Sequence, residues 1–226
     1  MNQNSHSATS KHYFNMEGEN YFNWQNRYQE RSGIINARKF QDKINPESTI
    51  LDFGCGSGYL LKTLISSKKI GIEVNPVAVK FAKSMGLEVY EDIKNIPTNS
   101  IDTCVSNHAL EHVYYPLGAL SEIFRVLRKR GKLLLCVPID EYINQKKFLK
   151  NDINNHLHTW TPQLIGNLCL EAGFKFENIK IKVFRHAWVP GTKYIWRYTR
   201  LFNAMCWIYS VLSRKGKQIF VEAQKT

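Results

Sequence analysis

The stretch ILDFGCGSGYLLKTLI (residues 50–65) places three alternate glycines, Gly54, Gly56 and Gly58, between two apolar runs. The run 48–53 is short, apolar and partly β-branched, so it predicts a buried strand. After the glycines, leucine and isoleucine recur at helical spacing, which predicts an amphipathic helix. Glycine tolerates positive φ and lets backbone approach a ligand closely. The pattern therefore indicates either a ligand site built on free backbone N–H groups or an ordinary glycine-rich turn.

Length and composition indicate one globular domain. The chain has 226 residues, of which 43% are hydrophobic and 22% charged, enough for a sizeable core. The five cysteines show neither paired spacing nor a ligand cluster with histidine, so we expect free thiols, no metal site and a reducing, cytoplasmic compartment. Residues 1–11 are polar and predict a disordered tail without an export signal. Residues 12–226 then form the single domain.

Beyond the glycine stretch, apolar runs and helical patterns alternate. Strands are expected at 69–73, 87–90, 102–107, 132–137, 174–184 and 218–222, and helices from Pro76, Pro116 and Pro162 up to glycines 86, 131 and 173. This alternation predicts an α/β fold, a doubly wound, mostly parallel sheet of seven strands with its site at the carboxyl ends of the strands. Two helices, 13–31 and 34–44, separated by Gly33, are expected to form an N-terminal helical cap over 12–45.

Positive charge is concentrated towards the end of the chain. The net charge is +12, and residues 180–226 hold ten Lys/Arg against one acid. Within them, 186–217 predicts a basic, aromatic helical insert before the last strand, with Lys193, Arg197 and Arg200 on one face. It is too short to span a bilayer. Four interpretations of this insert stay open: a pocket helix with a solvated face, a peripheral membrane or lipid-linked substrate contact, an oligomer contact, or a nucleic-acid surface.

An acidic residue supports the ligand-site interpretation of the glycines. Glu73 ends the second expected strand, 19 residues after Gly54. In doubly wound sheets a carboxylate at this place accepts hydrogen bonds from the ribose hydroxyls of a nucleoside ligand. The alternative is a surface glutamate at a strand end.

Five collinear segments resemble a known family, the class I S-adenosylmethionine-dependent methyltransferases, in particular their small-molecule type of domain. The segments are LDFGCGSG (51–58), GIEVN (71–75), YEDIKNIP (90–97), SIDTCVSNHALEHV (100–113) and LRKRGKLLLCVP (127–138), and HTWTPQLIGNLCLEAGF (158–174) extends the match. The glycine pattern departs from the dinucleotide Gly-x-Gly-x-x-Gly, which suits a ligand without a pyrophosphate. The resemblance implies a Rossmann-like class I methyltransferase fold with S-adenosylmethionine as cofactor and S-adenosylhomocysteine as product.

The resemblance also implies site residues. The loop beneath the methionine moiety would comprise Asp52, Gly54, Cys55, Gly56 and Gly58. Glu73 would hold the ribose, Val74 and Ile93 would flank the adenine, and Asp92 would accept from its amino group. Asn107 and His108 would approach the methionine part, and Tyr13 and Tyr21 are the expected lid residues. Asp92 could instead be a plain loop carboxylate.

Histidines are the candidates for a general base, which a hydroxyl acceptor needs. His156 is preferred, with His112 and His158 as alternatives; Glu111 and His112 could instead be architectural, pinning a short helix. His156 and His158 alternate, so only one should face the cleft if that stretch is extended. The expected function is methyl transfer to a hydroxyl of a small-molecule or glycan/lipid-linked acceptor. The alternatives are an RNA methyltransferase using the basic C-terminal surface and a non-catalytic, S-adenosylmethionine-binding scaffold. Oligomeric state is left open.

Overall fold

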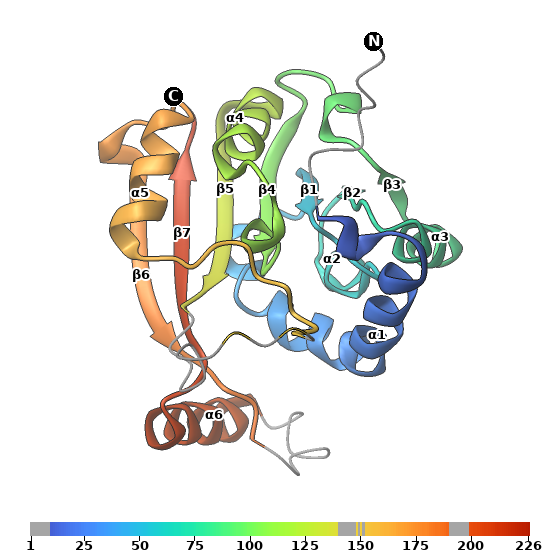
Figure 1. Cartoon of the computed structure of the whole chain (residues 1–226). Coiled ribbons are helices and arrows are strands. Elements are labelled where there is room, and N and C mark those ends of the chain that lie inside the picture. Colours follow the sequence, from blue (N-terminus) through green and yellow to red (C-terminus); the bar gives the residue numbers. More distant parts are fainter. Residues whose placement is uncertain (1–9, 140–147, 149, 151, 190–198) are drawn as a thin grey trace.

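The computed structural model describes residues 10–139, 148, 150, 152–189 and 199–226. Most of the expected N-terminal tail and part of the insert, including Lys193 and Arg197, therefore lie outside the described residues. A seven-stranded sheet forms the centre of the molecule, with the order β3-β2-β1-β4-β5-β7-β6 (Figure 1). β1 to β5 are mutually parallel, whereas β7 runs antiparallel to both β5 and β6. The mostly parallel α/β fold predicted from the sequence is confirmed.

The elements follow one another in the order that the sequence predicts. The strands are β1 (Thr49–Phe53), β2 (Lys68–Ile72), β3 (Glu88–Tyr90), β4 (Ile101–Asn107), β5 (Leu127–Pro138), β6 (Ile179–Arg185) and β7 (Lys217–Gln224). The α-helices are α1 (Asn15–Ala37), α2 (Tyr59–Thr63), α3 (Pro76–Ser84), α4 (Pro116–Val126), α5 (Pro162–Glu171) and α6 (Thr199–Ser213). Short 3-10 turns include η1 (Lys11–Tyr13), η2 (Gln41–Lys43), η3 (Ile93–Asn95), η4 (Leu110–His112) and η6 (Phe176–Asn178).

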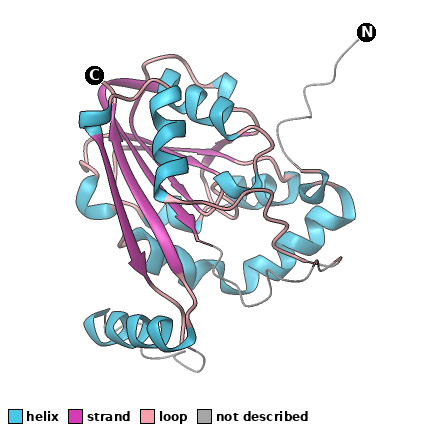
Figure 2. Ribbon diagram, turned by 60° about the vertical axis from the view of Figure 1, so that its left-hand side comes forward, coloured by secondary structure: helices cyan, strands magenta, loops and turns pink. Residues whose placement is uncertain are grey.

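Helices cover both faces of the sheet (Figure 2). Successive residues of β5 show this directly, because Leu133 and Leu135 pack in the core beneath α4 and α5, whereas Leu134 and Cys136 pack in the core beneath α2. A strand buried on both faces has no polar alternation, which is why 133–137 is a continuous apolar run.

Several element boundaries differ from the sequence expectation. α1 continues through Gly33 to Ala37, and a Cβ at Gly33 would lie 2.6 Å from the carbonyl carbon of Tyr59. The glycine therefore permits a close approach of α1 to α2 and does not end the helix. The predicted second helix over 34–44 is wrong, because residues 34–37 end α1 and residues 41–43 form the 3-10 turn η2. α4 ends at Val126, before Gly131, because β5 already begins at Leu127. β6 starts only at Ile179, after the turn η6.

The insert between β6 and β7 contains α6, beside the ends of these two strands (Figure 1). Phe202 and Cys206 recur at helical spacing, are fully buried and pack against Ile35 of α1. Other apolar side chains of the helix are exposed: Leu201, Trp207, Ile208, Val211 and Leu212. Among the described residues, no helix is long and apolar enough to cross a bilayer.

Candidate active site

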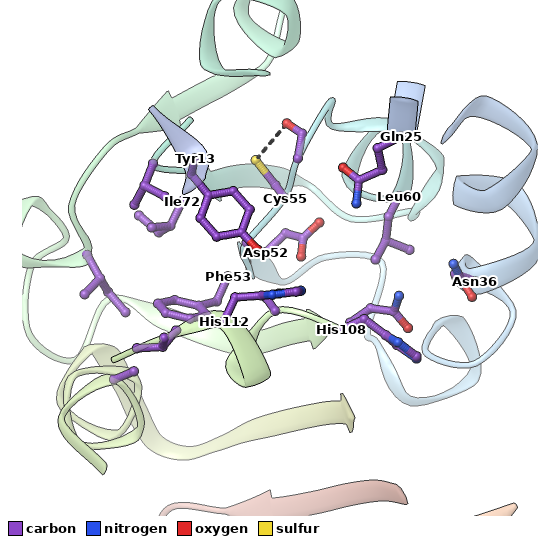
Figure 3. A pocket seen from close by; sticks show the side chains of 18 of the residues that line it. Tyr13, Gln25, Asn36, Asp52, Phe53, Cys55, Leu60, Ile72, His108 and His112 are labelled. Atoms are coloured by element: carbon purple, nitrogen blue, oxygen red, sulfur yellow. Dashed lines mark hydrogen bonds between the residues drawn. The ribbon is translucent and has the colours of Figure 1, made fainter. Parts of the chain in front are cut away.

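A cavity of about 1330 Å³ opens at the carboxyl ends of β1, β2 and β4 and is closed on one side by η1 and α1. This is the edge at which parallel α/β sheets bind ligands. Tyr13, Asp52 and His112 point toward the same space from three separate segments (Figure 3). The cavity therefore lies at the edge of the sheet where the sequence predicts the site.

The three glycines of the loop after β1 all have positive φ, at 78°, 54° and 82°. A Cβ at Gly54 would lie 2.3 Å from Ala109 Cβ, and a Cβ at Gly58 would lie 2.4 Å from Leu87 Cδ1. A Cβ at Gly56 would meet nothing nearer than 3.8 Å, where the side chain of Gln25 borders the cavity. Gly54 and Gly58 thus permit close packing within the chain, and Gly56 keeps the backbone bare at the cavity.

Glu73 holds this loop from behind. Its Oε2 accepts a hydrogen bond from Gly56 N–H (2.8 Å), and its Oε1 accepts from Val74 N–H (2.9 Å) and Asn75 N–H (2.8 Å). Burial raises the pKa of Glu73, and these three hydrogen bonds oppose that shift. Val74 lines the cavity, whereas Glu73 does not. A carboxylate has about four acceptor positions, so the ribose contact expected of Glu73 stays a prediction with one position left for it.

Asp52 is the most unusual polar group at the cavity. It is fully buried, and neither carboxylate oxygen accepts a hydrogen bond from any residue that the structure describes. Burial, together with the nearby Glu73 carboxylate, raises the pKa of Asp52 to about 8. The side chain lines the cavity. A cationic group of a ligand would satisfy such a carboxylate.

Cys55 also borders the cavity from this loop. Burial and the carboxylates of Asp52 and Glu73 raise the pKa of its thiol, so the sulfur is not activated as a nucleophile.

Another part of the cavity wall is formed by the segment after β3. Asp92 caps η3 by accepting from Lys94 N–H (2.9 Å), and Ile93 is buried beside it. Both line the cavity together with Val74. The three residues expected around an adenine thus lie at one wall, although Asp92 also serves the local turn.

Asn107 ends β4 and His108 follows it; both line the cavity, and both belong to a network that the sequence did not reveal. Lys39 Nζ donates to Asn107 Oδ1 (3.2 Å) and to Gln218 Oε1 (2.9 Å). His108 Nε2 lies 3.3 Å from the same Gln218 oxygen. Burial and Lys39 lower the pKa of His108 to about 3, so this imidazole is neutral. Lys39 and Gln218 carry no motif, and only the fold brings them together.

Tyr13 and Tyr21, the expected lid residues, are buried and line the cavity. Their ring centroids are 5.0 Å apart, and that of Tyr13 lies 5.5 Å from His112. Gln25 Nε2 donates to Tyr21 Oη (3.1 Å). Burial raises the pKa of both phenols, which keeps them neutral.

The three candidate bases occupy different positions. His112 is buried and lines the cavity, and its ring centroid lies 5.0 Å from that of half-buried His156. His158 Nε2 pairs with Val113 O (2.8 Å), and its ring lies against Trp160, 5.7 Å between centroids. Neither His156 nor His158 belongs to the cavity lining. The structure thus brings His112 and His156 together and turns His158 toward the backbone.

The carboxylate of Glu111 lies close to both His112 and His108. Its Oε1 is 4.0 Å from His112 Nε2 and 3.8 Å from His108 Nδ1. Glu111, His112 and His156 each offer a ligand atom within 4.8 Å of the others. Sequence spacing gave no sign of this cluster, because Glu111 and His156 are 45 residues apart.

Comparisons with known proteins agree with this geometry. Residues 51–135 match the family model described as "Methyltransferase domain". The chain is 32% identical over 108 residues to an uncharacterized methyltransferase of Schizosaccharomyces pombe (41% of either chain). It is 30% identical over 143 residues to the "Probable tRNA methyltransferase 9B" of Bos taurus (61% of this chain, 31% of that one). The chain spans at most half the length of the curated relatives it matches.

A solved structure shows the same fold. The crystal structure of a SAM-dependent methyltransferase from Archaeoglobus fulgidus superposes with a TM-score of 0.65 at 17% identity, covering 91% of this chain and 99% of that one. At 17% identity this superposition shows that the two proteins share a fold. The match of residues 51–135 to the family model is a similarity in sequence. The chain therefore has the fold of the class I S-adenosylmethionine-dependent methyltransferases, and its residues 51–135 match the methyltransferase-domain family model.

Proposed function

We propose that this chain methylates a hydroxyl oxygen of a small-molecule or glycan-type acceptor, including a lipid-linked one. The observation that carries the proposal is the size and shape of the cavity. Pockets for one drug-sized ligand measure roughly 300–1000 Å³, so about 1330 Å³ leaves room for an acceptor beside the cofactor. η1 and α1 close one side of this space, which suits a compact acceptor.

The residues present fit S-adenosylmethionine. When bound, it supplies a methyl group on a sulfonium, so the protein needs only to align the groups and exclude water. The buried Asp52 carboxylate, to which no described residue donates a hydrogen bond, would hold the cofactor's ammonium group, and the bare backbone of Gly56 would lie beneath the methionine moiety. Glu73 would keep that loop in place and hold the ribose, with Val74, Asp92 and Ile93 around the adenine.

The histidine end would receive the acceptor. His112 lines the cavity beside Tyr13, and His156 lies against His112. A neutral imidazole nitrogen there can take the proton of an acceptor hydroxyl. The buried rings of Tyr13 and Tyr21 exclude water from this end. His158 would hold the loop through Val113 and take no proton.

RNA is the second candidate acceptor. One relative is named a "Probable tRNA methyltransferase 9B", and the segment 180–226 is strongly basic. A flat basic surface binds phosphates without sequence preference. A non-catalytic, S-adenosylmethionine-binding scaffold is the third candidate, and methyl transfer to any acceptor would eliminate it.

The acceptor class is tested with methyl-tritiated S-adenosylmethionine and a lysate separated into small-molecule, lipid/glycan, RNA and protein fractions. A Gly56→Val variant, whose side chain would enter the cofactor space, is the control. Label in the small-molecule or glycan fraction, absent with the variant, supports the proposal. Label in RNA would replace it with the second candidate. Cofactor binding without any transfer across several lysates would favour a scaffold.

A further inference from the structure

We propose that Glu111, His112 and His156 bind a divalent transition-metal cation at the acceptor end of the cavity. One carboxylate oxygen and two imidazole nitrogens lie within 4.8 Å of one another. Glu111 Oε1 and His112 Nε2 are 4.0 Å apart, too far for a hydrogen bond between them. Ligands of one cation are about 3–3.5 Å apart, because each metal–ligand bond is about 2.0–2.2 Å long. Small side-chain rotations would bring these atoms to that spacing.

Burial favours a cation at this place. Glu111 is fully buried and His112 nearly so. An ionised carboxylate in a protein interior is costly unless positive charge lies close to it. A divalent cation held by Glu111 and the two imidazoles would supply such a charge.

A third histidine lies beside the cluster. Gln218 Nε2 donates to His186 O (3.2 Å), which turns the amide oxygen Oε1 toward His108 Nε2, 3.3 Å away. The other ring nitrogen, His108 Nδ1, lies 3.8 Å from Glu111 Oε1. A third imidazole nitrogen is therefore close to the proposed ligands.

The loop that carries His156 is fixed relative to η4. Leu157 N–H and His158 N–H both donate to the backbone oxygen of Glu111, at 2.9 and 3.2 Å. His158 Nε2 pairs with Val113 O, and His12 Nε2 pairs with Ile153 O (3.0 Å). These contacts set the separation of the three ligands before any ion binds, which is the arrangement that supports metal affinity.

The donor set indicates the kind of ion. Imidazole suits zinc, iron, copper and nickel, and carboxylate suits manganese and magnesium, so two imidazoles with one carboxylate suit Zn²⁺, Mn²⁺, Fe²⁺ or Co²⁺. Three protein ligands leave coordination positions open. Since His112 lines the cavity, these positions can face an acceptor.

A cation here narrows the acceptor class, and this step rests on the proposed function. The acceptor would carry a hydroxyl able to coordinate the ion, together with a neighbouring oxygen. Coordination lowers the pKa of a hydroxyl. Its O–H bond breaks and the proton passes to water, an oxygen lone pair forms the new O–C bond, and the C–S bond of the donor breaks with its electrons on sulfur. His112 and His156 would then act as ligands of the ion.

Metal binding is measured on the metal-stripped full chain, without cofactor or acceptor, by calorimetric titration with Zn²⁺ and with Mn²⁺. The wild type should bind one cation per chain. His156→Ala, on a half-exposed loop, should weaken binding at least about tenfold, and Glu111→Gln should do the same. His158→Gln is the matched control, because it removes an imidazole of the same loop and keeps a donor for Val113 O. Circular dichroism confirms folding; if Glu111→Gln does not fold, His156→Ala decides.

Visible absorption of the Co²⁺-loaded chain gives a second readout. Its d–d bands should change in His156→Ala and stay unchanged in His158→Gln. No binding tighter than millimolar, or equal binding by wild type and His156→Ala, would overturn the site. Because no methyl donor is present, this failure leaves the proposed function untouched. A chain that binds the ion but methylates its acceptor equally well after chelation would overturn the acceptor role alone.

Discussion

Replacing Asp52 with asparagine should remove a proton release that accompanies S-adenosylmethionine binding. In the free chain, burial and the Glu73 carboxylate raise the pKa of Asp52 to about 8. At pH 6.5 the carboxyl is therefore almost fully protonated. If the ammonium of the bound cofactor pairs with this side chain, the carboxylate form is favoured and the proton leaves.

The expected release from Asp52 is about one proton per cofactor at pH 6.5 and about one tenth of a proton at pH 9, where the free carboxyl is already ionised. Calorimetry in two buffers of different ionisation enthalpy measures it. Asparagine keeps the shape of Asp52 but does not titrate, so the difference between the proteins isolates this group from the cofactor's own amino group. Equal proton release by both proteins at pH 6.5 would refute the pairing.

The same shift predicts how stability depends on pH. A carboxyl with a raised folded-state pKa binds a proton that the unfolded chain has lost, so its contribution is complete below about pH 4 and disappears as pH rises through about 8. Between pH 6 and 8 the free energy of unfolding of the wild type should fall by up to roughly 1.4 kcal/mol per pH unit more than that of Asp52→Asn. Denaturant unfolding followed by tryptophan fluorescence tests this, and parallel pH profiles would contradict it.

Four further outcomes follow from the site and the insert. Glu73→Ala should weaken cofactor binding by about 1–3 kcal/mol, because charge-assisted hydrogen bonds are lost; unchanged affinity in calorimetry would exclude the ribose and loop roles together. Gly54→Ala should lower the melting temperature strongly. Gly56→Ala should cost only about 1–2 kcal/mol of stability but impair cofactor binding. A larger loss of stability in Gly56→Ala than in Gly54→Ala would contradict the roles given to these two glycines. His156→Ala should cut turnover while leaving cofactor affinity nearly unchanged, and equal loss of both would contradict its place at the acceptor end. If α6 contacts membranes, the chain should sediment with anionic vesicles at low salt and Trp207→Ser should reduce this; an absence of sedimentation would exclude that contact.

The cofactor half of the site could be predicted because its signals are local. Strand β1, its glycine loop and the strand ends at Glu73, Asp92 and Asn107 lie within sixty residues. Parallel strands bring their carboxyl ends to one edge, so the strand assignments put Glu73 beside the glycine loop, and the resemblance added Asp92 and Asn107. What the sequence could not show was the direction of Glu73, whose carboxylate turns back onto Gly56.

The predicted ends of helices were wrong where a glycine can serve either of two structural roles. Gly33 reads as a helix terminator, but in the structure it lets α1 approach α2. Gly131 reads as the end of α4, yet it lies within β5. A glycine pattern by itself does not distinguish a turn from close packing, because both need the missing Cβ.

The arrangement of the proposed acceptor half could not be predicted, although two of its histidines were candidates. It combines η1, η4 and the ends of β6 and β7, which border the cavity, with the loop 152–158, which is hydrogen-bonded to η4. These segments meet only in the folded chain. Glu111 and His156 become neighbours through two backbone hydrogen bonds to Glu111 O, and a sequence contains no trace of such bonds. In the proposed function the acceptor would be recognised by these irregular segments, and the cofactor by the segments that match the family model. Acceptor identity should therefore change with substitutions around His112 and His156 that leave cofactor affinity intact.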